Sequence, residues 1–408
     1  MAECLIWPIK PLKGICIQAV EALKSLRLID AAASLAESMK ALSALTKVLF
    51  RLATGILCGC SSVSHSSENS FSYFTALKNF SAFTQSQNEN GDTVLLSPDV
   101  KSRIRWNQLV LSWNASVPTG AFLKVEASAI SSSHHTKFYT IANWSPDNKM
   151  FSRTSLRGQQ DADGIVDTDT LVLERLADSA QIRLTPGGTT GALPSLKLLG
   201  LCFANTTVRP IAHSPNHAAW GKTISAPERS QFGYPGAKGW CSPASLSMVL
   251  ARWARILHRP EMDLPVPQVA AAVYDRDFDG TGNWPFNTAF AGSFPGMKAY
   301  VTRFDDISEV EDWIAAGIPV ILSARWDGLA PGRPPDSEGH LIVCIGFTEE
   351  GDVITNDPAT RVQRGEFVRR IYKRENVIRA WMKSHNAVYL VYPEGARIPP
   401  DRFGHWER

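Results

Sequence analysis

The amino-acid sequence predicts an α+β domain preceded by an all-β sandwich domain, on three observations. Residues 73–205 contain short runs of alternating polarity separated by turn residues, as half-buried strands do. Residues 246–253 carry apolar side chains at helical spacing. Residues 341–347 form a continuous apolar run typical of a buried strand. A chain of 408 residues has room for two or three domains, each with its own core.

Composition excludes several classes of function. The formal charge is +3, from 42 basic and 39 acidic residues, and no dense basic run is present, so nucleic acid is not indicated as a partner. The seven cysteines form neither CxxC pairs nor zinc-ligand spacing, which argues against a metal site and a disulfide framework. We therefore expect no metal and no organic cofactor. The composition does not exclude a reactive thiol at one of the cysteines.

The N-terminal extension, residues 1–60, contains a second possible start at Met39. Two lysines, the apolar run 48–57 and a pair of cysteines follow it, which predicts a short secretion signal. The segment resembles a bacterial lipoprotein signal with Cys60 as the lipidated residue, and it is too short to span a bilayer. Residues 61–72 are polar and Ser-rich, as tethers are. We expect an exported protein, periplasmic or associated with the cell envelope; an amphipathic helix or an untranslated upstream segment is the alternative.

Residues 73–205 predict the sandwich, because strand patterns recur between turn signals. The clearest expected strands are 105–113, 122–127, 137–142, 180–184 and 196–203. We find no catalytic constellation here, so the region is interpreted as a binding or spacer module with a cell-envelope ligand as a candidate partner. Its three tryptophans, Trp106, Trp113 and Trp144, would either stack on sugar rings or belong to the core. The acidic segment 161–167 lacks EF-hand spacing and is interpreted as a plain turn. Residues 206–224 are expected to form a linker.

A candidate nucleophile precedes the first helix of residues 225–395. Ser242 is a good N-cap and Pro243 suits the first helical position, so a helix is predicted to begin here. Its apolar face, residues 246–253, would pack on a core and leave Cys241 at the positive end of the helix. A thiol in that place is biased toward the thiolate, the form that attacks carbonyl carbons. The alternative is that Cys241 is a small buried apolar residue, as most free cysteines are.

A candidate base and its orienting partner come from a predicted hairpin. His340 begins the strand that continues to residue 347, and residues 353–357 read as the returning strand before Pro358. In an antiparallel hairpin His340 and Asp357 fall almost opposite each other. Asp357 could then accept from one ring nitrogen of His340, while the other nitrogen takes a proton from Cys241. Asn356 is the alternative partner. Because adjacent strand residues point to opposite faces, only one of Asn356 and Asp357 can meet His340.

A tetrahedral intermediate also needs donors for its oxyanion. The backbone N–H groups at the start of the Cys241 helix would supply one. Gln231, ten residues before Cys241, is the candidate side-chain donor.

Residues 225–395 resemble the cysteine peptidase family thirty-nine, whose best-known members process bacteriocin precursors after a double glycine, and more closely its stand-alone exported bacterial relatives. The shared landmarks are Trp240-Cys241-Ser242-Pro243, the segment 279–287, the segment 317–320, Gly339-His340-Leu341 and Asn356-Asp357-Pro358. The resemblance implies a papain-like fold. It also implies that Cys241 is the nucleophile, His340 the base, Asp357 its orienting partner and Gln231 the oxyanion donor.

These observations predict a thiol-dependent peptidase that hydrolyses peptide bonds of a peptide or protein substrate through a thioester acyl-enzyme. Two alternatives stay open: an amidase or acyl transferase with the same triad, and a non-enzymatic envelope-binding protein with a vestigial site. Trp284 would line a substrate subsite or cover the core. Residues 396–408 are expected to form a C-terminal tail.

Overall fold

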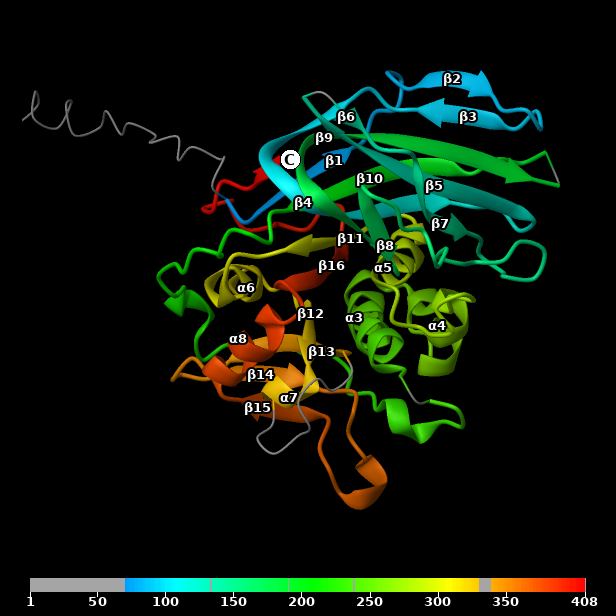
Figure 1. Ribbon diagram of the computed structural model, residues 1–408. Coiled ribbons are helices and arrows are strands. Elements are labelled where there is room, and N and C mark those ends of the chain that lie inside the picture. Colours follow the sequence, from blue (N-terminus) through cyan, green and yellow to red (C-terminus); the bar gives the residue numbers. More distant parts are fainter. Residues whose placement is uncertain (1–69, 133, 190, 238, 330–338, 408) are drawn as a thin grey trace, which may run out of the picture. The chain divides into compact units, whose positions relative to one another are not determined.

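The computed structural model of the protein describes residues 70–407, apart from residues 133, 190, 238 and 330–338 (Figure 1). The expected secretion signal with Cys60, and residues 61–69 of the expected tether, therefore lie outside the described residues. Within the described part of the chain, no helix is long and apolar enough to cross a bilayer.

The N-terminal sheet has eleven strands among the described residues, with the main order β17-β1-β10-β4-β9-β3-β2. Strands β5 and β8 join β9, while β6 and β7 join β5. Neighbours are antiparallel, except that β17 runs parallel to β1. The strands are β1 (Ser72–Leu77), β2 (Thr84–Gln87), β3 (Thr93–Leu96), β4 (Val100–Ser116), β5 (Ala121–Ser131), β6 (His134–His135), β7 (Tyr139–Trp144), β8 (Gly164–Asp167), β9 (Thr170–Gly188), β10 (Ser195–Ala204) and β17 (Trp406–Glu407).

The five strands expected in this region are confirmed as parts of β4, β5, β7, β9 and β10. They belong to one hydrogen-bonded sheet because β9 is long enough to change partners along its length. Its first half pairs with β8 and β4, and its second half pairs with β5. The all-β domain is thus a sheet domain, and its division into two stacked layers stays a prediction.

The side chains that suggested ligand binding in this domain have structural roles. Trp106, Trp113 and Trp144 are buried, with exposed fractions of 3% or less, so they belong to the core. The ring of Trp113 lies edge-on to Phe286 of the following domain, with a centroid distance of 6.2 Å. In the acidic turn, Asp161 accepts a hydrogen bond from Tyr139 and pairs with Lys137. This supports the interpretation of a plain turn.

The second sheet has the strand order β11-β16-β12-β13-β14-β15, and all its neighbours are antiparallel. In Figure 1, helix α3 lies on one side of β12, β13 and β16, and helices α6 and α8 lie on the other. The strands are β11 (Met297–Arg303), β12 (Val320–Arg325), β13 (Gly339–Phe347), β14 (Val353–Asn356), β15 (Arg369–Tyr372) and β16 (Ala387–Pro393). The helices are α3 (Cys241–Leu257), α4 (Val266–Val273), α5 (Trp284–Ser293), α6 (Ile307–Ala315), α7 (Trp326–Leu329) and α8 (Arg374–Met382). Short 3-10 helices span His217–Ala219, Gln231–Gly233, Pro260–Met262 and Val362–Arg364.

Side chains of the N-terminal sheet cover the edge strand β11, whose outward backbone groups need partners. Asn114 of β4 bonds both the N–H and the C=O of Ala299, at 3.1 and 2.6 Å, and Ser112 accepts the N–H of Val301 at 2.9 Å. Gly292 of α5 permits this approach, because a Cβ there would lie 2.0 Å from Asn114 Nδ2. The two sheets are thus joined by side-chain hydrogen bonds, and one continuous apolar core connects them.

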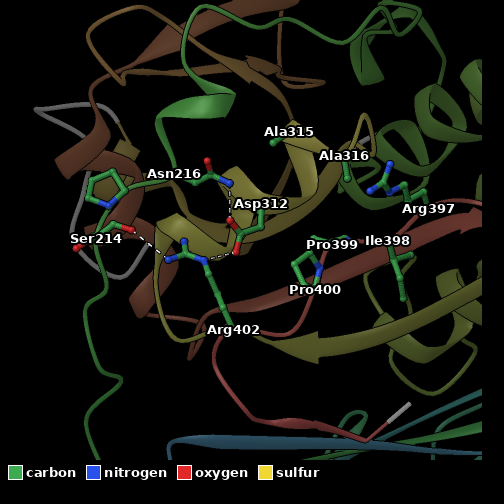
Figure 2. A pocket seen from close by; sticks show the side chains of 11 residues that line it. Ser214, Asn216, Asp312, Ala315, Ala316, Arg397, Ile398, Pro399, Pro400 and Arg402 are labelled. Atoms are coloured by element: carbon green, nitrogen blue, oxygen red, sulfur yellow. Dashed lines mark hydrogen bonds and ion pairs between the residues drawn. The ribbon is translucent and has the colours of Figure 1, made fainter. Parts of the chain in front are cut away.

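The C-terminal residues, expected to form a tail, are part of the packed structure. Trp406 and Glu407 form β17, which pairs with β1 of the N-terminal sheet. Arg402 Nε donates to Asp312 of α6 at 2.6 Å and Arg402 Nη1 donates to the carbonyl of Ser214, as Figure 2 shows. The expectation of a tail was wrong because the Trp406 side chain packs into the core, where it is only 9% exposed.

Candidate active site

Helix α3 begins at Cys241, two residues earlier than the capping pattern suggested. The N-cap is Trp240, which makes no side-chain capping bond, and the first intrahelical bond runs from the Ala244 N–H to the Trp240 carbonyl. Gly239, with φ +80°, turns the chain into the helix. The predicted N-cap at Ser242 was therefore wrong, and its hydroxyl lies 2.9 Å from the Tyr389 hydroxyl instead.

This start places Cys241 at the first helical position with an exposed fraction of 8%. The first intrahelical hydrogen bond is donated by the Ala244 N–H, so the backbone N–H groups of Cys241 and Ser242 have no partner within the helix, and Pro243 has no N–H. Two N–H groups and the positive helix end therefore lie beside the thiol, a suitable environment for a developing negative charge.

His340 and Asp357 are in direct contact. His340 Nε2 lies 2.8 Å from Asp357 Oδ1, and both side chains are buried, with exposed fractions of 1% and 0%. Asn356 points elsewhere, since its Nδ2 donates to the carbonyls of Ala226 and Pro227. Of the two candidates for the partner of His340, the structure brings Asp357 to the imidazole.

The strand register explains this contact. The β13–β14 ladder ends with Val343 opposite Asn356, so Asp357 lies past its last pair. Continued by one residue, the ladder would put Asp357 opposite Ile342, and His340 lies two residues further on the same face. The two residues are therefore diagonal neighbours, and the expectation that they fall almost opposite each other agrees with the observed contact.

The charges of this pair support each other. Burial lowers the pKa of His340, but the Asp357 carboxylate and the nearby Cys241 sulfur have a larger opposite effect, so the pKa is raised from its ordinary value to about 9. Burial raises the pKa of Asp357, but His340, Tyr372 and the Ala359 N–H hold it below its ordinary value. At neutral pH the structure thus favours an imidazolium between a carboxylate and the Cys241 thiol. Because His340 Nε2 faces Asp357, its Nδ1 is left for Cys241.

Three supporting contacts were missed in the sequence. The indole of Trp326 stacks on the His340 ring, with a centroid distance of 4.0 Å and an interplanar angle of 11°. The Tyr372 hydroxyl donates to Asp357 Oδ2. Ser245 of α3 donates to the carbonyl of Leu341, next to His340. No motif marks such contacts, since each depends on how elements distant in sequence pack together.

Gln231 lies beside the segment that carries Asp357 into the site. Its backbone N–H donates to the carbonyl of Pro358 at 2.8 Å, and its side chain is 5% exposed. Among the described residues, its Oε1 atom has no hydrogen-bond partner. Its role as an oxyanion donor stays a prediction.

Two pockets are lined by residues that follow the N-terminal sheet domain in sequence. One of about 520 Å³ is lined by residues on both sides of Gln231, including Ser230, Gly233 and Tyr234. Another of about 600 Å³, shown in Figure 2, is lined by Asp312, Arg402 and their neighbours. Neither pocket is lined by Cys241, His340 or Asp357. The residues that line the first pocket include sequence neighbours of Gln231, and those that line the second do not. In the described part of the chain no group of three His, Cys, Asp or Glu side chains is arranged to hold a metal ion.

Trp284, at the start of α5, is partly buried against the core. The guanidinium of Arg303 lies 5.9 Å from the centre of its ring, and its backbone N–H donates to Asp169 at 2.7 Å. These contacts favour the covering role over a substrate subsite.

Comparisons with known proteins agree with this division of the chain. Residues 76–204 match the Peptidase C39 N-terminal domain, and residues 223–389 match the Peptidase_C39 like family, C39 being peptidase family thirty-nine. No curated protein matches the sequence.

Two solved structures show slight likeness. A Bacillus anthracis protein described as a C39-like peptidase is 16% identical with a TM-score of 0.31, and the match covers 42% of this chain and 98% of that chain. The structure of the Gt strain of infectious bursal disease virus is 10% identical with a TM-score of 0.19, and the match covers 33% of each chain. Neither bears on the assignment, which rests on the two family matches. The chain is therefore a relative of the C39-like peptidases, with an N-terminal sheet domain and an α+β domain that match the two domain types.

Proposed function

We propose that the protein is a cysteine peptidase that hydrolyses peptide bonds through a thioester acyl-enzyme, with Cys241, His340 and Asp357 as its triad. The observation that carries the proposal is the buried contact of His340 with Asp357. The Cys241 sulfur lies near enough to the same imidazole to contribute to its raised pKa. Burying a charged pair costs several kcal/mol of desolvation free energy, so its retention beside a helix N-terminus favours a chemical role over a purely structural one.

In the acylation step, the proton of Cys241 is held on His340 Nδ1 of the imidazolium, and the thiolate sulfur attacks the carbonyl carbon of the scissile bond. A C–S bond forms and the carbonyl oxygen becomes an oxyanion. When the intermediate collapses, the C–N bond breaks, and the leaving amine takes the proton from His340. Asp357 keeps the imidazole oriented and stabilises its positive charge throughout.

In the deacylation step, water attacks the thioester while His340 accepts its proton. The C–S bond breaks, the acid is released and the proton returns to the sulfur. The oxyanion of both steps would accept from the backbone N–H of Cys241 and from the side-chain amide of Gln231. Removal of one such donor typically lowers turnover by about 10²–10³-fold.

The pocket of about 520 Å³ beside Gln231 is the proposed place for the substrate chain. It holds the ion pair of Arg229 with Asp263 and the half-buried ring of Tyr234, so it offers polar and apolar contacts to a peptide. The substrate sequence is not specified by these residues.

The proposal is tested by incubating the protein with a mixture of unstructured peptides in ¹⁸O-labelled water and analysing the products by mass spectrometry. Hydrolysis places ¹⁸O in the new carboxyl group, whereas transfer of the acyl group to an amine does not. We expect labelled products from the wild type and none from Cys241→Ala, while Cys202→Ala, a buried cysteine of the N-terminal sheet, keeps activity. Labelled products from Cys241→Ala would refute the assignment.

The place of action is part of the proposal. Segment 39–60 has the pattern of a secretion signal, so the peptidase would act outside the cytoplasm, anchored through Cys60 and with the N-terminal sheet near an envelope ligand. Cell fractionation is the test: recovery of a cytoplasmic protein that retains residues 1–38 would contradict export.

A further inference from the structure

A hydroxyl outside the triad holds the turn that leads into the nucleophile. Thr281 Oγ1 donates to the carbonyl of Gly239 at 3.1 Å. Gly239 lies two residues before Cys241 and has a left-handed conformation, with φ +80°. The direction of its peptide plane decides where helix α3 starts, and therefore where the Cys241 sulfur and N–H point.

Thr281 is itself fixed by a buried set of amide side chains. Asn287 Nδ2 donates to the carbonyls of Thr281 and Asn283, at 2.9 and 2.8 Å. Asn283 Nδ2 donates in turn to Asp275 Oδ2 at 2.8 Å. These four side chains are between 0% and 4% exposed, so bulk water does not replace their hydrogen bonds. A buried polar network of this kind holds its members in one arrangement.

The far end of this network is held by the N-terminal sheet domain. The Ser155 N–H donates to Asp275 Oδ1 at 3.0 Å. Asp169 accepts the N–H of Trp284, at the start of α5, at 2.7 Å. Arg153, which is 1% exposed, donates to the carbonyls that end α4, including that of Ala271 at 2.7 Å. The loop between α4 and α5 is thus clamped between the N-terminal domain and the nucleophile turn.

We propose that Thr281 is a positioning residue for Cys241, and that the N-terminal sheet domain supports the active site through Asp275, Asn283 and Asn287. This rests on the proposed function of Cys241 as nucleophile. It assigns the N-terminal domain a part in catalysis besides any binding role: it keeps the loop rigid, and the loop keeps the thiol aligned with His340.

The test is the rate of alkylation of Cys241 by iodoacetamide between pH 5 and 9, measured by mass spectrometry, together with the melting temperature. Thr281→Val has nearly the same shape but no donor. Thr281→Ser restores the donor. Thr288→Val is the matched control, because Thr288 is also buried but bonds only carbonyls of its own helix, at Trp284 and Pro285.

We expect Thr281→Val to lower the alkylation rate at pH 7 by at least about fivefold and to change the pH profile. Thr281→Ser should recover the wild-type profile, and Thr288→Val should keep it even where its melting temperature falls. If Thr281→Val does not fold, Thr281→Ala is measured in its place. A wild-type profile in the valine or alanine variant would overturn this inference alone. An unreactive Cys241 in the wild type would overturn the proposed function, and this inference with it.

Discussion

The hydroxyl of Ser245 donates to the carbonyl of Leu341 at 3.1 Å, and this bond joins the helix of the nucleophile to the strand of the base. Ser245 lies one helical turn after Cys241, and Leu341 directly follows His340. Both residues are buried, so water does not compete for this bond, and the bond fixes the position of α3 along β13. The bond thus ties the helix that carries the thiol to the strand that carries the imidazole.

Ser245→Ala should lower both stability and thiol reactivity. The buried Leu341 carbonyl would lose its partner, which costs about 1–3 kcal/mol, and α3 would be free to shift along β13. Ser247→Ala is the control, because the Ser247 hydroxyl donates to Ala244 within the same helix and accepts from Arg229, and neither partner lies on β13. Urea unfolding and alkylation rates of both variants check the prediction. Equal alkylation rates for the two variants would show that the Ser245 bond does not align the site.

Asp357→Asn should reduce the turnover of the folded protein by about 10²–10⁴-fold, because the amide keeps the shape but not the charge that stabilises imidazolium. Asn356→Ala should leave the turnover of the folded protein nearly unchanged. It leaves the Ala226 and Pro227 carbonyls without a partner, so it lowers the free energy of unfolding but keeps the activity of the folded molecules. Kinetics and denaturant unfolding separate the two effects. Inactivation by Asn356→Ala alone would mean that the triad must be redrawn.

The stability of the protein should fall as the pH rises from about 6.5 to 10. Burial lowers the pKa of His405, but Glu309 and Asp305 raise it, to about 10, and the pKa of His340 is raised to about 9. A histidine whose pKa is raised by folding stabilises fully below its unfolded value, near 6.5, and loses this contribution as the pH passes its folded value. Both contributions therefore disappear on the alkaline side.

This pH dependence is measured by comparing the wild type with His405→Gln and His340→Gln. At pH 6.5 each variant should be less stable than the wild type by roughly 1–3 kcal/mol, and the difference should shrink toward pH 10. A difference in stability that stays constant from pH 6.5 to 10 would mean that the carboxylate partners do not raise the pKa of either histidine.

Much of the fold could be predicted because its elements carry local signals. The alternating runs of residues 105–113 and 196–203 lie in β4 and β10, and the hairpin of residues 341–357 is present as β13 and β14. Gly317, which follows helix α6, has φ +82°, a conformation typical of glycine after a helix end. These features depend on short-range periodicity and on backbone preference, which a single sequence contains.

The candidate site could be predicted in part for the same reason. Hairpin geometry predicted His340 near Asp357, and their diagonal placement depends on the register of the ladder, which shifts between Cys344 and Gly346. The start of α3 was misplaced because Ser242 resembles a capping residue, whereas its hydroxyl bonds to Tyr389, 147 residues away. Thr281 and Ser245 were missed because their partners are fixed only when the loop, the helix and the sheet have packed together.

The most direct test of the account is peptide mapping after brief exposure to iodoacetamide near pH 7, in the wild type and in His340→Ala. Among Cys202, Cys241 and Cys344, the account predicts that Cys241 is alkylated first and that His340→Ala slows its alkylation strongly. Cys202 and Cys344 are 1% exposed or less, and burial raises the pKa of both thiols, that of Cys344 to about 12. Faster labelling of Cys202 or Cys344, or a Cys241 rate that does not depend on His340, would contradict the claim that Cys241 is an activated nucleophile.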